Sequence, residues 1–313
     1  MKRRQLLGDR YELRGLLGRG GMAEVRDGWD HRLCRPVAIK TLRSSPPTQA
    51  EVRQRFEDEA RSTAALSHPH IVAVHDCGER GEAPYIVMER LTGDTLRDAI
   101  ACGPLEQARV RTVLDHVLSA LAAAHAAGIV HRDIKPANIL FTESGDEIKV
   151  ADFGIATSPG MSHTTGELVG TIAYLSPERL NGAPASVADD LYAVGVVGYE
   201  ALAGQRPFEP DDEVGPLVHS ILHDDPPPLR TLRPDVDPHL AAVVERALSR
   251  DPRLRFESAE DMRAALHGYR APTSMVGHLA RAVVPRAARS ESGPRTAPLE
   301  PPVGVDEIAP LAG

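Results

Sequence analysis

The chain has 313 residues, a formal net charge of −8, and 42% hydrophobic, 26% charged and 4% aromatic residues. These values describe a globular protein with a mainly aliphatic core, long enough for one large or two moderate domains. An acidic balance without a basic stripe argues against a nucleic-acid-binding surface.

Cysteine spacing and the apolar runs exclude further classes of protein. Cys34, Cys77 and Cys102 lie far apart with no C-x-x-C spacing, so neither a disulfide framework nor a zinc site is predicted. The basic N-terminus has no apolar run that fits a signal peptide. The longest apolar stretches, 117–130 and 191–204, are too short and too polar to span a bilayer. We therefore expect a cytoplasmic protein that does not enter a membrane.

The first part of the chain is predicted to form an antiparallel sheet with one helix. Strand-like residues occur at 11–13, near Val25 and at 36–40, and a turn is expected around Asp30. A helix is predicted over residues 50–66, and two further strands over 71–75 and 85–89.

The predicted helix places a carboxylate on its buried face. The residues of that face recur at spacings of four and three, as a helix requires: Val52, Phe56, Glu59, Thr63 and Leu66. A carboxylate on this face needs a cation, and the neighbouring strand offers Lys40.

The second part of the chain is mainly helical. An amphipathic helix is predicted over 106–127 with Gly128 as its stop, and a hairpin follows at 139–141 and 148–150. Residues 157–170 are expected to be a mobile loop, and the Pro- and Ala-rich residues 271–313 a disordered tail. Further helices are predicted over 190–203, 214–222, 238–248 and 258–269.

The loop of residues 131–138, with the sequence HRDIKPAN, contains several charged and polar side chains within eight residues. Asp133, Lys135 and Asn138 place a carboxylate, a cation and an amide between two apolar runs. Polar groups at the boundary of the core lower the stability of the fold unless they are hydrogen-bonded, so their presence indicates either such bonds or a role in binding or catalysis. A purely structural role is the alternative, in which Asp133 and Asn138 only cap turns and Lys135 is solvated.

A glycine-rich segment precedes this loop in the sequence. Residues 18–25 lie between strands, so their backbone can approach phosphates closely. The strand at Val25 excludes the Rossmann fingerprint, which requires a helix after the glycines, and no lysine and hydroxyl follow at the Walker spacing.

Five elements in order then match the protein-kinase signature set. They are Gly18-x-Gly20-x-x-Ala23-x-Val25, the strand 37–40 that ends in Lys40, Glu59, HRDIKPAN and residues 152–154 with the sequence DFG. The chain resembles the Hanks-type Ser/Thr protein kinases, most closely their bacterial branch. Residues 9–13, 20–25 and 68–72 carry the closest similarity. Ala23 replaces the third glycine of the loop, and Thr63 is polar where an apolar contact is expected.

The resemblance implies an α+β, bilobal protein-kinase fold. Residues 1–10 would be an N-terminal extension, and residues 11–270 the kinase domain. Within that domain the resemblance implies an N-lobe over 11–90 and a C-lobe over 94–270, with ATP bound between them.

The resemblance also assigns roles to individual residues. Lys40 would contact the α- and β-phosphates of ATP and be held by Glu59. Asp133 would accept or orient the substrate hydroxyl proton, and Lys135 would neutralise charge on the transferred group and favour Ser/Thr specificity. The metal ligands, for Mg²⁺ or Mn²⁺, would be Asn138 and Asp152. His131 would pack against Phe153 rather than act as an acid or base.

The adenine and phosphates of ATP would contact residues for which a role in the core is the alternative. The residues expected to line this site are Leu17, Gly18, Gly20, Gly21, Val25, Ala38, Met88, Glu89, Leu91 and Leu140.

Residues 170–178 resemble the peptide-binding segment of the family and include Thr171. Glu178 would pair with Arg255, and Asp190 would anchor the HRDIKPAN loop. Arg132 beside Asp133 is typical of kinases that are switched on by phosphorylation of a loop, so we expect autophosphorylation of Thr165 or Thr164. Ordinary solvated loop hydroxyls are the alternative.

The leading hypothesis is thus an active kinase that transfers the γ-phosphoryl of ATP to protein substrates, including itself. A nucleotide-binding scaffold and a small-molecule kinase are the rivals, disfavoured by the intact site residues and by residues 170–178. Regulation through the tail, through a partner or through a homodimer formed by the N-lobe stays open.

Overall fold

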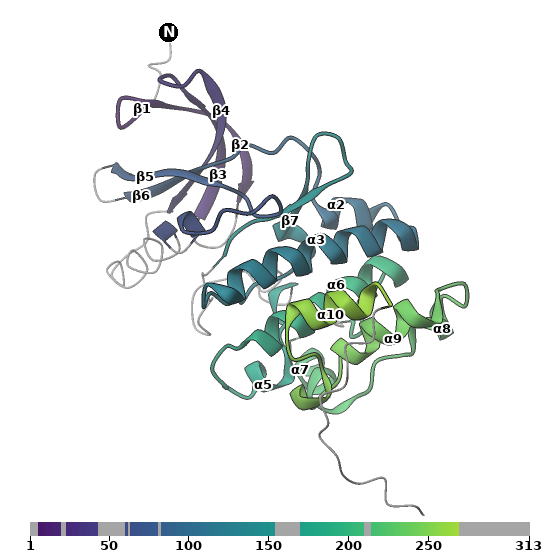
Figure 1. The fold of residues 1–313 in the computed structure, drawn as a ribbon. Helices are drawn as coiled ribbons and strands as arrows, with labels where there is room; N and C mark the ends of the chain where they lie inside the picture. Colours follow the sequence, from purple (N-terminus) through teal and green to yellow (C-terminus); the bar gives the residue numbers. More distant parts are fainter. Residues whose placement is uncertain are drawn as a thin grey trace, which may run out of the picture. The chain divides into compact units, whose positions relative to one another are not determined.

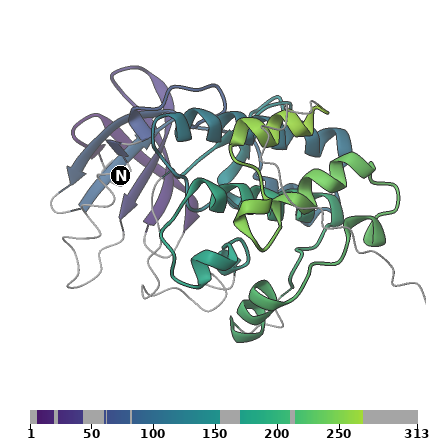
Figure 2. The same ribbon diagram turned by 60° about the horizontal axis from the view of Figure 1, so that its bottom comes forward.

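The computed structural model describes residues 6–19, 23–42, 60–61, 63–80, 83–153, 170–209 and 214–268. Contacts divide the chain into residues 1–272 and 273–313, and every described residue belongs to the first unit. Within that unit the strands drawn in purple and blue lie apart from the helices drawn in teal to yellow-green (Figures 1 and 2). The predicted α+β fold class is confirmed.

The N-terminal part is a six-stranded antiparallel sheet. Its order is β1-β2-β3-β4-β6-β5, so every paired couple of strands is consecutive in the sequence except β4 and β6. The sheet begins at Leu6, inside the segment that was expected to precede the domain. The strands are β1 (Leu6–Leu7), β2 (Tyr11–Arg19), β3 (Ala23–Asp30), β4 (Arg35–Leu42), β5 (Val74–Arg80) and β6 (Ala83–Met88).

The register of the sheet sorts its side chains onto two faces. Val25 is opposite Lys40, and Ala38 is opposite Met88. Because side chains alternate along a strand, Ala38 and Lys40 share one face. The opposite face forms a small core of Leu7, Tyr11, Val37, Ile39, Tyr85 and Val87.

The strand expected at residues 71–75 is displaced along the chain. β5 begins at Val74, whereas Ile71 makes only an isolated parallel bridge with Val150. Ile71 is 1% exposed and packs in the core of the helical part. Its apolar character therefore reflects this packing and not membership of the sheet.

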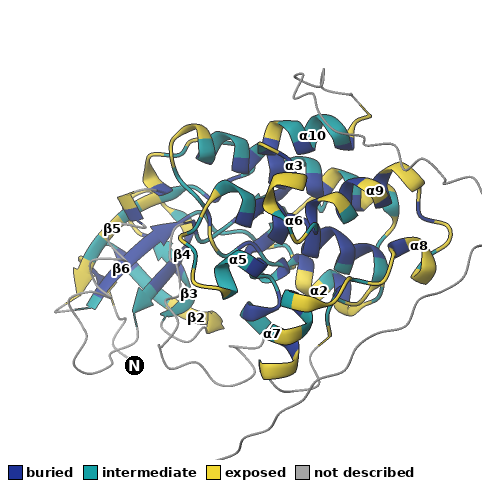
Figure 3. Cartoon of the chain, turned by 90° about the horizontal axis from the view of Figure 1, so that it is seen from below, coloured by how far each residue is buried: buried dark blue, intermediate teal, exposed yellow. Residues whose placement is uncertain are grey.

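The helical part surrounds α6 (Val187–Ala203), which is buried around most of its circumference. Figure 3 shows burial concentrated on this helix and on the inward side of α3 (Gln107–Ala126). The hairpin of β7 (Ile139–Phe141) and β8 (Ile148–Val150) has the predicted bounds. The other helices are α2 (Leu96–Ala101), α5 (Pro177–Leu180), α7 (Val214–His223), α8 (Leu229–Leu232), α9 (Pro238–Ala247) and α10 (Ala259–Leu266), with 3-10 turns at Pro136–Asn138 and Pro252–Leu254.

Most helix bounds agree with the predictions to within a few residues. The largest differences are three residues: α6 begins at Val187 instead of Asp190, and α10 ends at Leu266 instead of Tyr269, with Gly268 following in the left-handed region at φ +78°. The predicted helix 50–66 is described only at its end, where residues 60–61 and 63–64 are helical. The expected mobile loop and tail lie almost entirely outside the described residues. In the described part of the chain, no helix combines the length and apolar character needed to cross a bilayer.

Candidate active site

Asp190, near the start of α6, holds the loop 131–138 in place. Its carboxylate accepts the backbone N–H of His131 and of Arg132, each at 2.8 Å, and a ring nitrogen of His125 lies at 2.8 Å. Arg132 has a φ of +72°, a conformation that a residue with a side chain adopts only when its surroundings fix it. The predicted anchoring role of Asp190 is thus confirmed.

Asp133 lies between two donors from its own loop. The Nζ of Lys135 is 2.7 Å from Oδ2 and 2.9 Å from Oδ1 of the Asp133 carboxylate. The Asn138 side-chain amide donates to Oδ2 of Asp133 at 3.0 Å and to its backbone carbonyl at 2.8 Å. The 3-10 turn Pro136–Asn138 returns the chain toward Asp133, so residues five apart meet.

Lys40 and Asp152 form an ion pair between the sheet and the chain beyond β8. The Lys40 Nζ is 2.8 Å from Oδ1 of Asp152, and Lys40 is 5% exposed. Burial alone would raise the pKa of the Asp152 carboxyl, but the charge of Lys40, its hydrogen bond and the nearby Lys135 together outweigh burial and lower that pKa. Asp152 is therefore an ionised carboxylate at neutral pH.

His131 is a packing residue, as predicted. Its ring centroid lies 4.4 Å from that of Phe153, both side chains are buried, and its Nε2 lies 3.0 Å from the Ala151 carbonyl oxygen. Burial lowers the pKa of His131, so the ring stays neutral. A neutral ring enclosed in this way has no route to act on a substrate.

The oxygens of Asn138 and Asp152 suit a hard divalent cation. The Asn138 amide nitrogen is used on Asp133, which leaves its carbonyl oxygen for another partner. Among the described residues no group of three or more His, Cys, Asp or Glu side chains could hold a metal ion. A Mg²⁺ site that is completed by phosphate and water needs only one or two protein carboxylates, so these residues fit that type of site.

The face of the sheet beside Lys40 carries an apolar cluster that suits a planar base. Ala38, Val72 and Met88 are buried there, with Val25, Leu91 and Ala151 packed around them. Four of the predicted adenine contacts thus meet, namely Ala38, Met88, Val25 and Leu91. Two others, Leu17 and Leu140, lie outside the cluster, and Leu17 is 41% exposed. Val72 and Ala151 were not predicted.

The Glu89 side chain turns away from this cluster to the hairpin. It forms an ion pair at 2.9 Å with Lys149 of β8 and accepts the Ala73 N–H at 3.3 Å. Its neighbour Arg90 pairs with Asp27 of β3 at 2.9 Å. These contacts fix the short connection after β6, whose backbone was predicted to bind adenine.

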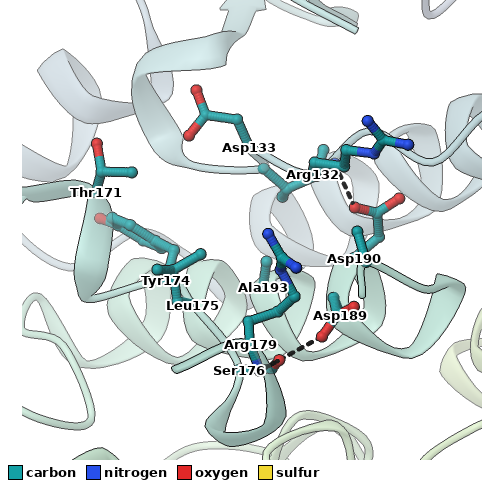
Figure 4. A pocket seen from close by; sticks show the side chains of 12 residues that line it. Arg132, Asp133, Thr171, Tyr174, Leu175, Ser176, Arg179, Asp189, Asp190 and Ala193 are labelled. Carbon is teal, nitrogen blue, oxygen red and sulfur yellow. Dashed lines mark hydrogen bonds between the residues drawn. The ribbon is translucent and has the colours of Figure 1, made fainter. Parts of the chain in front are cut away.

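A pocket separates the loop 131–138 from residues 170–178, which were predicted to bind a peptide substrate and are called the substrate segment on that basis. The Oγ1 of Thr171 is 3.5 Å from the Lys135 Nζ, which joins the two sides. The Tyr174 hydroxyl donates to Glu200 of α6 at 2.5 Å. Figure 4 shows Arg132 and Asp133 on one side and Thr171, Tyr174, Leu175 and Ser176 on the other.

An ion pair between the buried Arg255 and the partly exposed Glu178 joins the substrate segment to the C-terminal end of the described chain. Two nitrogens of Arg255 lie 2.5 and 2.8 Å from the two carboxylate oxygens of Glu178. Arg255 is 1% exposed and also donates to backbone carbonyls, including that of Ser249 at 2.8 Å. The predicted pairing is confirmed.

Several predicted site residues lie outside the described residues. They are Gly20, Gly21, Glu59, Thr164 and Thr165. The described site also contains a contact that was not predicted, a hydrogen bond from the Thr63 hydroxyl to the Phe153 carbonyl. The only signal for it was a polar residue on an apolar helix face.

Comparison with known proteins agrees with this geometry. The family described as "Protein kinase domain" matches residues 11–266. A probable serine/threonine-protein kinase of Streptomyces coelicolor is 43% identical over 272 residues, which cover 84% of this chain and 40% of that protein. Serine/threonine-protein kinase PknB of Mycolicibacterium smegmatis is 44% identical over 271 residues, with coverage of 84% and 43%.

Two further comparisons cover more of the related protein. Serine/threonine-protein kinase PknA of Mycobacterium tuberculosis is 40% identical over 313 residues, which cover 93% of this chain and 71% of the relative. The crystal structure of the Mycobacterium tuberculosis PknI kinase domain superposes with a TM-score of 0.67 at 31% identity, covering 84% of this chain and 97% of that domain. The chain spans only about two fifths of the Streptomyces and Mycolicibacterium relatives. It belongs to the protein kinase family, within the bacterial Hanks-type serine/threonine-protein kinases.

Proposed function

We propose that this chain is a serine/threonine protein kinase, which transfers the γ-phosphoryl group of ATP to hydroxyls of protein substrates. Residues 11–270 form the kinase domain in this proposal, with the N-lobe at 11–90, to whose sheet the preceding residues add β1, and the C-lobe at 94–270. The observation that supports it most is the arrangement of Asp133, held by Lys135 and Asn138 and facing the substrate segment.

Phosphoryl transfer requires mainly positioning and charge stabilisation from the protein. Asp133 accepts the proton of the attacking hydroxyl in this assignment, and Lys135 stabilises charge on the transferred group. Lys40 binds the α- and β-phosphates and is held by Glu59. The Lys135–Thr171 contact brings the substrate segment next to the reacting groups.

The proposed metal ligands are Asn138 and Asp152, and Mg²⁺ or Mn²⁺ is the proposed ion. A bound divalent cation neutralises phosphate charge and orients the phosphates. The ionised Asp152, kept so by Lys40, supplies the negative oxygen that such a cation prefers. Asn138 adds a neutral oxygen and keeps its amide on Asp133.

The proposed nucleotide site combines the glycine-rich loop with the apolar cluster next to Lys40. Stacking between Val25, Ala38 and Met88 would hold the adenine ring, and backbone groups of Glu89 and Leu91 would bind its edge. Gly18, with Gly20 and Gly21, would cover the phosphates, and Leu17 and Leu140 would close on the base.

Labelling with [γ-³²P]ATP and Mg²⁺, followed by acid hydrolysis of the protein, tests the proposed reaction. We expect phosphoserine or phosphothreonine on the chain itself and on a basic protein such as myelin basic protein. Absence of labelled protein under all conditions would refute the assignment, and label only on small molecules would favour the rival small-molecule kinase.

We also propose activation by autophosphorylation at Thr165 or Thr164. Arg132 supports this because its side chain is exposed beside Asp133 and pairs with no acidic group of the described chain. A phosphate on the loop would supply that partner. Phosphopeptide mapping should place phosphate within residues 157–170, and a fully active chain without phosphate there would contradict the proposal.

Two further proposals concern partners and location. One proposal is that two copies pair through the N-lobe, where four of the six exposed large hydrophobic residues of the described chain lie: Leu6, Leu16, Leu17 and Leu33. Sedimentation should show a dimer that Leu33→Ser weakens, and a wild-type monomer at all concentrations would refute it. We propose that the protein acts in the cytoplasm without entering a membrane, and its acidic composition argues against nucleic acid as a partner.

A further inference from the structure

Thr63 makes a contact that its position in a helix does not require. A threonine hydroxyl in a helix commonly donates to a carbonyl of the preceding turn. Here Oγ1 of Thr63 donates to the backbone carbonyl of Phe153 at 3.2 Å, across 90 positions of sequence, and both residues are buried. The hydroxyl therefore connects the end of this helix to the backbone directly after Asp152.

The chain that follows Thr63 is fixed on the other side of Asp152. The Val72 N–H donates to the Val150 carbonyl at 3.0 Å, and the Val150 N–H donates to the His70 carbonyl at 2.9 Å. One continuous segment, residues 63–72, thus holds the backbone both before and after Asp152.

Asp152 needs such support because its backbone is strained. Its φ is +63°, in the left-handed region that residues with a side chain adopt rarely and at a cost. Packing of the buried Phe153 ring and the hydrogen bond to its carbonyl both restrain the backbone directly after Asp152, and the bonds of Val150 and Val72 restrain it before. The left-handed conformation of Asp152 is thus held from both sides, and this conformation sets the direction in which its side chain leaves the backbone toward Lys40.

We propose that Thr63 is a positioning residue, whose hydroxyl holds the Asp152 carboxylate toward a metal-bound nucleotide. The inference rests on the proposed assignment of Asp152 as a metal ligand. Valine has the shape of threonine without the donor, so Thr63→Val leaves the buried Phe153 carbonyl without this partner. Thr63→Ser keeps the donor.

Binding of the β,γ-imido analogue of ATP, measured by calorimetry with and without Mg²⁺, tests the proposal without turnover. In Thr63→Val we expect the Mg²⁺-dependent gain in affinity to fall roughly fivefold, the effect of about one lost hydrogen bond. Affinity without Mg²⁺ should not change, and Thr63→Ser should recover the gain.

Thr112→Val is the matched control. The Thr112 hydroxyl also donates to a backbone carbonyl at 3.2 Å, that of Ala108, but on the exposed surface of α3. It should bind like the wild type.

Three results would overturn the proposal for Thr63. They are an unchanged metal-dependent gain in Thr63→Val, an equal loss in Thr63→Ser, and a loss in Thr63→Val of binding without metal as well. If Mg²⁺ gives the wild type no gain, the assignment of Asp152 itself fails, and the role of Thr63 with it.

Discussion

Removal of the Glu178 carboxylate should destabilise the fold strongly. The Arg255 side chain is 0% exposed, so Glu178→Ala leaves a guanidinium in the interior without its counter-charge. Breaking a buried ion pair in this way costs about 3–5 kcal/mol. The Glu178 side chain is 20% exposed and Arg255 keeps its bonds to carbonyls such as that of Ser249, which favours the lower end, about 3 kcal/mol.

This cost translates into a large shift of the thermal midpoint. For a domain of this size each kcal/mol lowers Tm by about 2–4 °C, so Glu178→Ala should unfold about 6–12 °C below the wild type. The assay is calorimetric unfolding at pH 7 in the absence of nucleotide. Glu209→Ala is the control, because Glu209 is 54% exposed and pairs with Arg206 at 3.6 Å, a contact worth about 0–1 kcal/mol.

The stability lost in Glu178→Ala should also decrease as the pH falls. Burial alone would raise the pKa of Glu178, but the hydrogen bonds from Arg255 hold that pKa below its ordinary value of 4.5. A carboxyl with a depressed pKa stabilises the fold above pH 4.5, and the contribution is lost as pH falls through the folded pKa. The difference between wild type and Glu178→Ala should shrink accordingly. Equal Tm values for Glu178→Ala and Glu209→Ala at pH 7 would refute the reasoning.

Three other perturbations should act on stability or activity in distinct ways. Burial holds the pKa of His116 below 6.5, and its ring stacks on that of His70 with centroids 3.8 Å apart. The unfolded chain therefore takes up a proton at His116 first, and the folded state loses stability as pH falls from 6.5 toward the folded pKa. In urea titrations between pH 7 and 5.5, His116→Phe should lose less stability than the wild type. Asp190→Asn should lower kcat roughly ten- to a hundredfold with nucleotide affinity unchanged, because charge-assisted bonds to two backbone N–H groups are weakened. Gly93→Ala should cost about 1–3 kcal/mol in the same urea assay, because an added Cβ would overlap the backbone carbonyl of Phe141.

Local patterns were enough to predict much of the fold. The apolar face of α3 is a strong periodic signal, and a turn at residues 144–146 between two short apolar runs marks the β7–β8 hairpin; the bounds of both agree with the structure to within one residue. α2 was not delimited because six residues are too few for a periodic pattern, although its capping box from Thr95 to Asp98 is visible in the sequence. Ile71 was misplaced because an apolar run does not say which core it joins.

Some contacts of the site could likewise be predicted from neighbouring residues, whereas others depend on the tertiary fold. Asp133, Lys135 and Asn138 are neighbours in sequence, so their meeting follows from one turn of chain. Residue spacing cannot predict that Val72 completes the apolar cluster or that Thr63 reaches Phe153, because only the tertiary fold brings them together.

The most direct test of the proposed function is the rate of phosphoryl transfer by Asp133→Asn, with nucleotide affinity measured on the same sample. Loss of a proton acceptor typically costs about 10²–10⁴-fold in rate, so we expect a fall of that size in kcat with unchanged nucleotide affinity. Asp146→Asn, on the exposed turn between β7 and β8, is the matched control and should keep the wild-type rate. Equal rates for wild type and Asp133→Asn would contradict the account.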